Sequence, residues 1–359
     1  MDLASRDHQR TRIALAPAHS SYNSFIDRFA ESIASGGYEV VDFRWNPLRL
    51  AGVALVILHW PNEFFAARAG AESLKAAMKL QLLRSLRRLG GLRVVWVAHN
   101  ARPHDSVFAA PALTQRFLHT VDGVIYLSRH SRVAIRSCYR LRPSTLELVS
   151  AHGHYRDGSR PDPPVAPAAR QPVQLLCFGQ VRPYKNVEAL LRCAAQLPPQ
   201  LIRLTIAGVS GDEALTTRLR FLAADAPQVR LALQRSPLSE AELSAVINAA
   251  HAVVLPYREI LHSGAALYAL SHNRPVLAPR LGSLPELQSE VGSEWLQLYD
   301  GPLTPDLLRS WIRTLREHAR SGQPDLSAHD WNRLGPETCR FIERLLPARE
   351  VHPGPRLHL

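Results

Sequence analysis

The chain is poor in the residues that build covalently or metal-stabilised folds. It has only four cysteines among 359 residues, and their spacing matches neither a disulfide framework nor a zinc site. The longest apolar run, at 51–58, is strand-sized and falls short of the roughly 18 residues that span a bilayer. No apolar segment with a cleavage site follows Met1. We therefore expect a protein that is not secreted, has no membrane span and resides in a reducing cytoplasm.

Acidic residues are scarce in the first half. Residues 1–160 carry 22 Lys and Arg against 12 Asp and Glu, which accounts for +10 of the chain's net charge of +12. A basic half-molecule implies an anionic partner, which is a nucleic acid, an acidic membrane face or a phosphorylated substrate. We expect no nucleic acid, because the basic residues are not interleaved with exposed aromatics.

The length and the pattern of apolar segments predict two domains. At about 150 residues per domain, 359 residues suggest two. Strands alternate with helical stretches, which is typical of doubly wound parallel α/β sheets. The predicted strands are 12–16, 38–43, 53–59, 92–98, 123–127, 147–150, 173–178, 202–207, 229–233, 252–255 and 276–278. Five prolines mark 157–172 as a linker, so the predicted parts are an N-terminal domain 1–156, this linker, a C-terminal domain 173–346 and a disordered tail 347–359.

A glycine and two cations follow the first strand of the second domain. Gly179 ends the strand, and Arg182 and Lys185 precede a predicted helix, 186–197. Guanidinium, ammonium and helix N–H groups can converge there on a phosphate. Taken alone, the segment from Gly179 to Lys185 is also compatible with an ordinary turn that carries two solvated cations. In open α/β folds ligands bind at the carboxyl ends of strands, so we expect the site in a cleft between the domains.

A second predicted phosphate contact lies at a helix start. Ser263 is a candidate N-cap, and Ser263 and Gly264 offer N–H groups at the positive helix end to a diphosphate. A simple capped helix is the alternative. Tyr257 and Glu259, in the preceding loop, and Glu286, in a predicted loop at 282–286, are candidates for contacts with the nucleotide or its sugar.

Histidines follow the strands of the first domain. His59 and Trp60 close one buried strand, and His99, His104 and Asp105 follow the next. Although polar residues beside proline are usually loop residues, their concentration at one sheet edge favours an acceptor site. We expect His99 or Asp105 to be the general base. His59, Trp60, His104 and a later histidine, His154, are predicted to position the acceptor. No metal is expected, because no metal-ligand spacing accompanies these histidines.

The predicted helix 66–89 is basic and amphipathic. Lys75, Lys79 and Arg84 alternate with leucines and a methionine. Such helices often lie on anionic bilayers. A plain surface helix packed on the sheet is the alternative.

Several segments together resemble a known family. Two doubly wound domains with these turns resemble the GT-B glycosyltransferases, which have two Rossmann-like domains facing a cleft. More closely, the chain resembles the xanthan-type GDP-mannose:glycolipid β-mannosyltransferases. The segments that carry this resemblance are Leu58-His59-Trp60-Pro61, His99-Asn100 with Pro103-His104-Asp105, His152 to Asp157, Phe178-Gly179 with Arg182 to Lys185, Ser263-Gly264 with Arg274 to Pro279, and Pro324 to Ser327 with Asp330-Trp331.

The resemblance implies mannose transfer from GDP-mannose onto a polyprenyl-diphosphate-linked oligosaccharide in exopolysaccharide biosynthesis. It implies inversion without a metal, with the nucleotide sugar as co-substrate, at the cytoplasmic face of the inner membrane, where the enzyme is peripheral. The chain departs from the retaining GT-B pattern of two glutamates. Glu259 matches the first, but the second falls at Leu267 or Tyr268.

Two other interpretations stay open. One is a retaining hexosyltransferase that uses UDP-glucose or another nucleotide sugar. The other is a non-catalytic lipid- or polyanion-binding protein on a degenerate GT-B scaffold. The intact turn with Arg182 and Lys185 argues against the second interpretation, and the missing helical glutamate argues for it.

Overall fold

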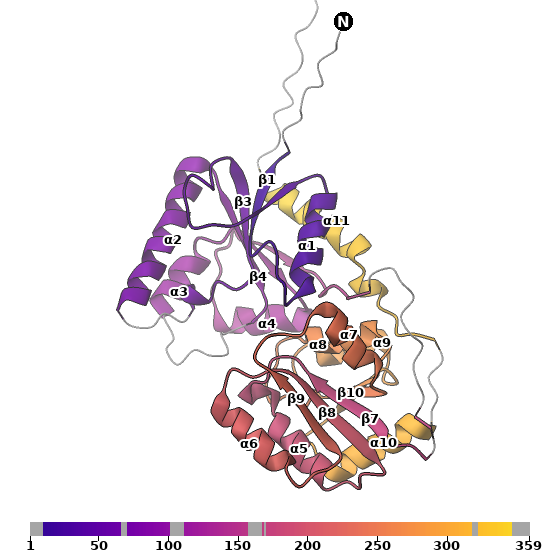
Figure 1. Cartoon of the computed structure of the whole chain (residues 1–359). Coiled ribbons are helices and arrows are strands. Elements are labelled where there is room, and N and C mark those ends of the chain that lie inside the picture. Colours follow the sequence, from indigo (N-terminus) through magenta and orange to yellow (C-terminus); the bar gives the residue numbers. More distant parts are fainter. Residues whose placement is uncertain are drawn as a thin grey trace, which may run out of the picture.

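Two α/β units, each built on a six-stranded parallel sheet, make up the computed structural model (Figure 1). The structure describes residues 10–65, 70–100, 111–156, 167–168, 170–317 and 322–346. The predicted doubly wound α/β class is confirmed, because every strand pair in both sheets is parallel. Most of the predicted linker and all of the predicted tail lie outside the described residues.

The N-terminal sheet has the order β2-β1-β3-β4-β5-β6. Its central strands are nearly continuous runs of Val, Ile and Leu, as expected for strands covered on both faces. Its strands are β1 (Arg12–Ala16), β2 (Glu39–Asp42), β3 (Val53–Leu58), β4 (Arg93–Ala98), β5 (Gly123–Tyr126) and β6 (Leu146–Val149).

Helices cover both faces of this sheet. One face packs against α1 (Ser24–Ser35) and α11 (Trp331–Leu345) through a core that includes Phe25 and Ile33. The other packs against α2 (Ala71–Gly90), α3 (Pro111–Leu118) and α4 (Arg129–Cys138). The predicted basic helix is thus a packed helix, whose Leu80 and Leu83 are buried on the sheet.

The C-terminal sheet has the order β12-β11-β10-β7-β8-β9. Its strands are β7 (Val173–Phe178), β8 (Ile202–Val209), β9 (Val229–Gln234), β10 (Ala252–Val254), β11 (Val276–Pro279) and β12 (Leu296–Tyr299). The helices on one face are α5 (Val187–Ala195), α6 (Glu213–Ala223) and α10 (Pro305–Glu317). Those on the other face are α7 (Glu240–Asn248), α8 (Gly264–Ser271) and α9 (Leu284–Val291).

The structure differs from the sequence prediction in its last part. Strand β12 was not predicted, and the predicted loop at 282–286 includes the first residues of α9. The C-terminal unit also does not extend to residue 346, because α11 crosses back and lies beside α1 (Figure 1). Phe341, Ile342 and Leu345 of α11 belong to the N-terminal core, so burial of this apolar face fixes the last helix on the first domain.

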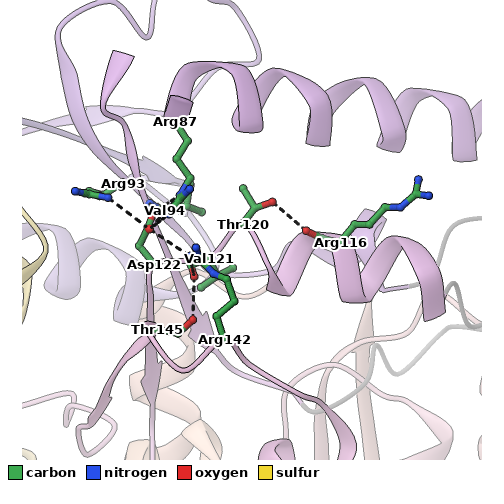
Figure 2. A network of polar contacts seen from close by, with 9 residues as sticks. All are labelled: Arg87, Arg93, Val94, Arg116, Thr120, Val121, Asp122, Arg142 and Thr145. Carbon is green, nitrogen blue, oxygen red and sulfur yellow. Dashed lines mark hydrogen bonds and ion pairs between the residues drawn. The ribbon is translucent and has the colours of Figure 1, made fainter. Parts of the chain in front are cut away.

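One buried carboxylate joins several elements at the amino-terminal edge of the N-terminal sheet (Figure 2). Asp122, directly before β5, accepts hydrogen bonds from Arg87 Nη2 at 2.7 Å and Arg142 Nη2 at 3.3 Å. The Val94 N–H donates to it at 3.1 Å, and Arg93 Nη1 lies 3.7 Å away. Because Arg87 lies in the last turn of α2, Asp122 ties that helix to β4 and to the loop before β6. This edge is opposite to the carboxyl ends of the strands.

We expect Asp122→Asn to lower the free energy of unfolding by about 3 kcal/mol, because it leaves several guanidinium groups beside a neutral amide. Urea denaturation measures the change. Asp300→Asn is the matched control, since Asp300 pairs with Arg280 at 3.4 Å but its side chain is 78% exposed, and its effect should stay within about 0.5 kcal/mol. Equal effects of the two substitutions would contradict the role given to Asp122.

Candidate active site

A cavity of about 550 Å³ lies between the two domains. Its N-terminal wall comes from the loops after β1, β3, β4 and β6, and its C-terminal wall mainly from the loops after β7 and β10 and from α8. The carboxyl ends of both sheets therefore meet at this cavity, hereafter the cleft, as expected for ligand sites in open α/β folds. Of the predicted site residues, the cleft brings together Trp60, His99, Gly179, Lys185 and Gly264.

Gly179 and Lys185 form one corner of the cleft. Gly179 has φ +100°, a conformation that favours glycine. A Cβ at this position would also lie only 2.9 Å from Lys185 Nζ, which donates to the Phe178 carbonyl at 3.4 Å. Burial lowers the pKa of Lys185, and the neighbouring Arg182 lowers it further. An anion beside this desolvated ammonium would stabilise its charged form, so the corner suits a phosphate.

The start of α8 forms the adjoining wall. Ser263 Oγ accepts from the Ala266 N–H at 3.1 Å, as predicted for an N-cap, and lies 3.3 Å from the Tyr257 hydroxyl. The next two residues, Gly264 and Ala265, line the cleft with the first N–H groups of the helix. A Cβ on Gly264 would come within 3.1 Å of Tyr155 Oη, so the close packing of Tyr155 favours glycine at this position. Tyr257 and Ser263 support this wall from behind it.

Three predicted donor contacts lie elsewhere. Arg182 directly precedes the 3₁₀ turn Pro183–Lys185 and does not line the cleft. Glu259 is exposed outside it. Glu286, expected near a ribose, instead accepts from the backbone N–H groups of Arg129 at 3.0 Å and His130 at 2.5 Å. These N–H groups open α4, so Glu286 caps a helix of the other domain and joins the domains.

Two histidines predicted to serve the acceptor form a buried pair beside the N-terminal wall of the cleft. His59 Nδ1 lies 2.9 Å from His99 Nε2, within hydrogen-bonding distance. Trp60 stacks on His99 with ring centroids 4.6 Å apart, and Phe25 of α1 lies edge-on to both imidazoles. Burial lowers the pKa of His59 to about 3 and that of His99 well below its usual value. His59 lies behind His99 and does not line the cleft.

Further histidines extend this group across the cleft. The ring of His262, from the second domain, lies 5.8 Å from that of His99 and 6.0 Å from that of His152. His152 donates from Nδ1 to the Gly153 carbonyl at 2.9 Å, and burial lowers its pKa to about 4. The described residues contain no group of three or more His, Cys, Asp or Glu side chains placed to hold a metal ion.

His154, a further predicted acceptor residue, is not in the cleft. His154 lines a second cavity, between α1 and α11, and its backbone carbonyl accepts from Trp331 Nε1 at 2.9 Å. His104 and Asp105 lie outside the described residues. The sequence predicted that His154 positions the acceptor. His152, two residues earlier, does line the cleft and can take that role.

Sequence reasoning missed the loop after β1. His19, Asn23 and Asp27 line the cleft, and the side chain of Asn23 caps α1. The signal was present in the chain, because His19 follows a predicted strand, 12–16, whose end faces the same edge as those of β3 and β4. From the sequence, Tyr268 was identified only as one of two positions at which the second glutamate of the retaining GT-B pattern is missing. It lines the cleft and packs on Tyr155 with ring centroids 4.5 Å apart.

Comparison with known proteins agrees with this geometry. Residues 172–301 match a family model described as glycosyl transferases group 1. Over 281 residues, 77% of this chain and 76% of the relative, the sequence is 33% identical to a GDP-mannose:glycolipid 4-beta-D-mannosyltransferase of Xanthomonas campestris pv. campestris. The chain belongs to the group 1 glycosyltransferases. This membership identifies the protein as an enzyme and sets aside the non-catalytic interpretation.

Solved glycosyltransferases have the same fold. Sucrose-phosphate synthase from Thermosynechococcus elongatus is 17% identical and superimposes with a TM-score of 0.67, over 94% of this chain and 99% of that one. The glycosyltransferase WaaG, described as involved in lipopolysaccharide biosynthesis, is 13% identical with a TM-score of 0.60, over 92% and 99% of the two chains. At this identity the likeness shows the fold alone, and the fold is GT-B. Among the described residues, no helix of this glycosyltransferase is long and apolar enough to cross a membrane.

We expect Lys185→Ala to reduce turnover of the glycosyltransferase by about a hundredfold, because a cation aimed at developing negative charge contributes most in the transition state. The fold should survive, since Lys185 lies at the cleft surface. Steady-state sugar transfer and thermal unfolding measure the two effects. Arg192→Ala, an exposed cation on α5, is the control. Near-wild-type turnover of Lys185→Ala would remove this corner from the mechanism.

Proposed function

We propose that this glycosyltransferase moves mannose from GDP-mannose onto a polyprenyl-diphosphate-linked oligosaccharide. The transfer inverts the anomeric carbon and needs no metal, and it takes place at the cytoplasmic face of the inner membrane during exopolysaccharide biosynthesis. The observation that carries the proposal is the corner formed by Gly179, Lys185 and the α8 start, which lies in the same cavity as a wall of aromatic and imidazole rings. The mannosyltransferase relative, aligned over 77% of the chain, supports the choice of donor and of a glycolipid acceptor.

The C-terminal wall suits the departing nucleoside diphosphate. When the bond between the sugar and the diphosphate breaks, negative charge grows on the leaving oxygen. Lys185 and the N–H groups of Gly264 and Ala265 lie in one wall and are positive before the reaction begins, so little reorganisation is needed. These groups can neutralise a diphosphate without a divalent cation, which supports metal-independent transfer.

The N-terminal wall suits a sugar acceptor. Trp60 stacks on His99 and lines the cleft, and an aromatic face of this kind can pack on the apolar face of a pyranose. Asn100 and His152 place polar groups in the same wall for sugar hydroxyls.

Tyr268 supports inversion. It lines the cleft on α8, at one of the two positions where the retaining GT-B pattern has its helical glutamate. A phenol does not provide the carboxylate of that donor clamp. Direct displacement by the acceptor hydroxyl fits such a site, and it requires a base on the acceptor side.

The α2 helix supports peripheral membrane association. It lies on the outer side of the N-terminal domain (Figure 1), and Leu74 and Met78, one turn apart, are each 64% exposed. Lys75 is exposed beside them, whereas Lys79 pairs with Glu63 at 2.9 Å. Exposed apolar side chains next to a cation fit an anionic bilayer surface.

We expect GDP and GDP-mannose to raise the unfolding temperature without added metal, while UDP, UDP-glucose and UDP-glucuronate do not. A ligand at about a hundred times its dissociation constant stabilises the native state by about 2.7 kcal/mol, which is measurable. Thermal unfolding against this panel makes the test. A shift confined to the uridine nucleotides would replace GDP-mannose by a UDP-sugar donor.

We expect the double variant Leu74→Ser/Met78→Ser to bind vesicles of anionic phospholipid about tenfold more weakly, because about 1.4 kcal/mol of apolar burial in the bilayer is lost. Co-sedimentation with such vesicles measures the change. Phe221→Ser is the control, since Phe221 is 81% exposed but lies on α6 of the other domain. Equal binding by the double variant and the wild type would exclude this face of α2.

A further inference from the structure

His19 and Asp27 form a hydrogen-bonded pair at the edge of the cleft. His19 belongs to the turn after β1, and Asp27 lies in the first turn of α1. His19 Nδ1 contacts Asp27 Oδ1 directly. The Ser20 N–H donates to the same carboxylate oxygen at 3.3 Å. Both side chains line the cleft whose other wall carries Gly179 and Lys185.

The pair has the form of a base with its orienting group. Asp27 is only 28% exposed and receives its hydrogen bonds from one turn, so its position is fixed. Because a carboxylate accepts from Nδ1–H, the neutral imidazole carries its lone pair on Nε2. The His19 side chain is 79% exposed, which leaves that nitrogen open to a molecule in the cleft.

We propose that His19, held by Asp27, is the base that deprotonates the acceptor hydroxyl. This assignment rests on the proposed inverting transfer. The acceptor O–H bond breaks and its proton passes to His19 Nε2. The acceptor oxygen forms the new bond to the anomeric carbon, and the bond from that carbon to the diphosphate breaks, with its electron pair leaving on the nucleoside diphosphate. Asp27 stabilises the imidazolium that results.

The buried histidines of the cleft suit this step less well. His59 and His99 engage each other at 2.9 Å, and His152 donates to the Gly153 carbonyl. Burial lowers the pKa of all three, so a proton transferred to any of them would be held weakly. His19 is exposed and has a carboxylate beside it, so the structure sets it apart from these three.

We expect His19→Gln to lower kcat by a factor of about 10² to 10⁴ and Asp27→Asn by about tenfold. The probes are GDP-[¹⁴C]mannose and membranes from cells in which the gene for this chain is deleted, where its acceptor accumulates. Label in the glycolipid fraction measures transfer. The rise in unfolding temperature with GDP should be unchanged in both variants, since neither residue belongs to the donor wall.

The pH profile separates a base from a structural residue. In the wild type, transfer should decline toward acidic pH because protonated His19 cannot take a proton, and this limb should be absent in His19→Gln. The other titratable and charged groups of the cleft are the same in both enzymes, so their contributions cancel in the comparison. They are Lys185, Glu240 with its partner Arg28 at 3.9 Å, His99, His152, His262, Tyr22, Tyr155, Tyr184 and Tyr268.

Control variants distinguish a wrong base assignment from a wrong proposed function. His119→Gln, an exposed histidine on the turn after α3, should transfer normally. If His99→Gln loses the acidic limb of the pH profile and His19→Gln retains it, His99 is the base. That result would overturn the assignment of His19 and leave the proposed mannosyltransferase activity unaffected. If the wild type transfers only from a UDP-sugar, the donor is wrong, and the same variants test the base with that donor. Transfer from no nucleotide sugar would overturn both proposals.

Discussion

All strands of each sheet run in the same direction, and the position of every functional group depends on this constraint. A parallel sheet places each strand-following loop at one edge, so residues as far apart in sequence as His19, Trp60 and His99 reach one wall. The opposite edge of the N-terminal sheet carries the Asp122 network, which contributes stability and lies away from the cleft. The carboxyl-terminal edge of the sheet thus carries the cleft residues, and the amino-terminal edge carries a network that stabilises the fold.

The cleft is electrostatically asymmetric. Its donor wall has a desolvated ammonium and the positive end of α8, and both attract negative charge. Its acceptor wall has imidazoles that burial keeps neutral, packed on Phe25 and Trp60. In the transfer proposed above, the neutral, aromatic wall receives sugar hydroxyls and ring faces and the positive wall receives the diphosphate, so each substrate is directed to its own side. The Glu286 contact with α4 holds these unlike walls together.

The sequence predicted most strands because buried parallel strands are continuous runs of β-branched and aliphatic residues, as in Val53–Leu58. It missed β12, a four-residue strand at the edge of its sheet. It placed Glu286 in a loop, whereas Glu286 lies in the first turn of α9, where the preceding Pro285 is compatible with the helix. The cluster of Trp60, His99, Gly179, Lys185 and Gly264 could be predicted from strand ends. The partners of Glu286 and His19 depend on domain packing and turn geometry, which no local pattern encodes.

The return of α11 to the first domain also has a consequence for how the protein is made on the ribosome. Phe341, Ile342 and Leu345 complete the core that Phe25 and Ile33 begin. The N-terminal domain therefore emerges first but cannot close its hydrophobic core until nearly the whole chain has been synthesised. The C-terminal sheet and its helices, which span Val173–Glu317, leave the ribosome before that helix does. At about 5–20 residues per second, the first domain waits roughly ten seconds or more with α1 in place but with the part of that sheet face that α11 covers still exposed. During that interval nascent-chain chaperones have an apolar surface to bind.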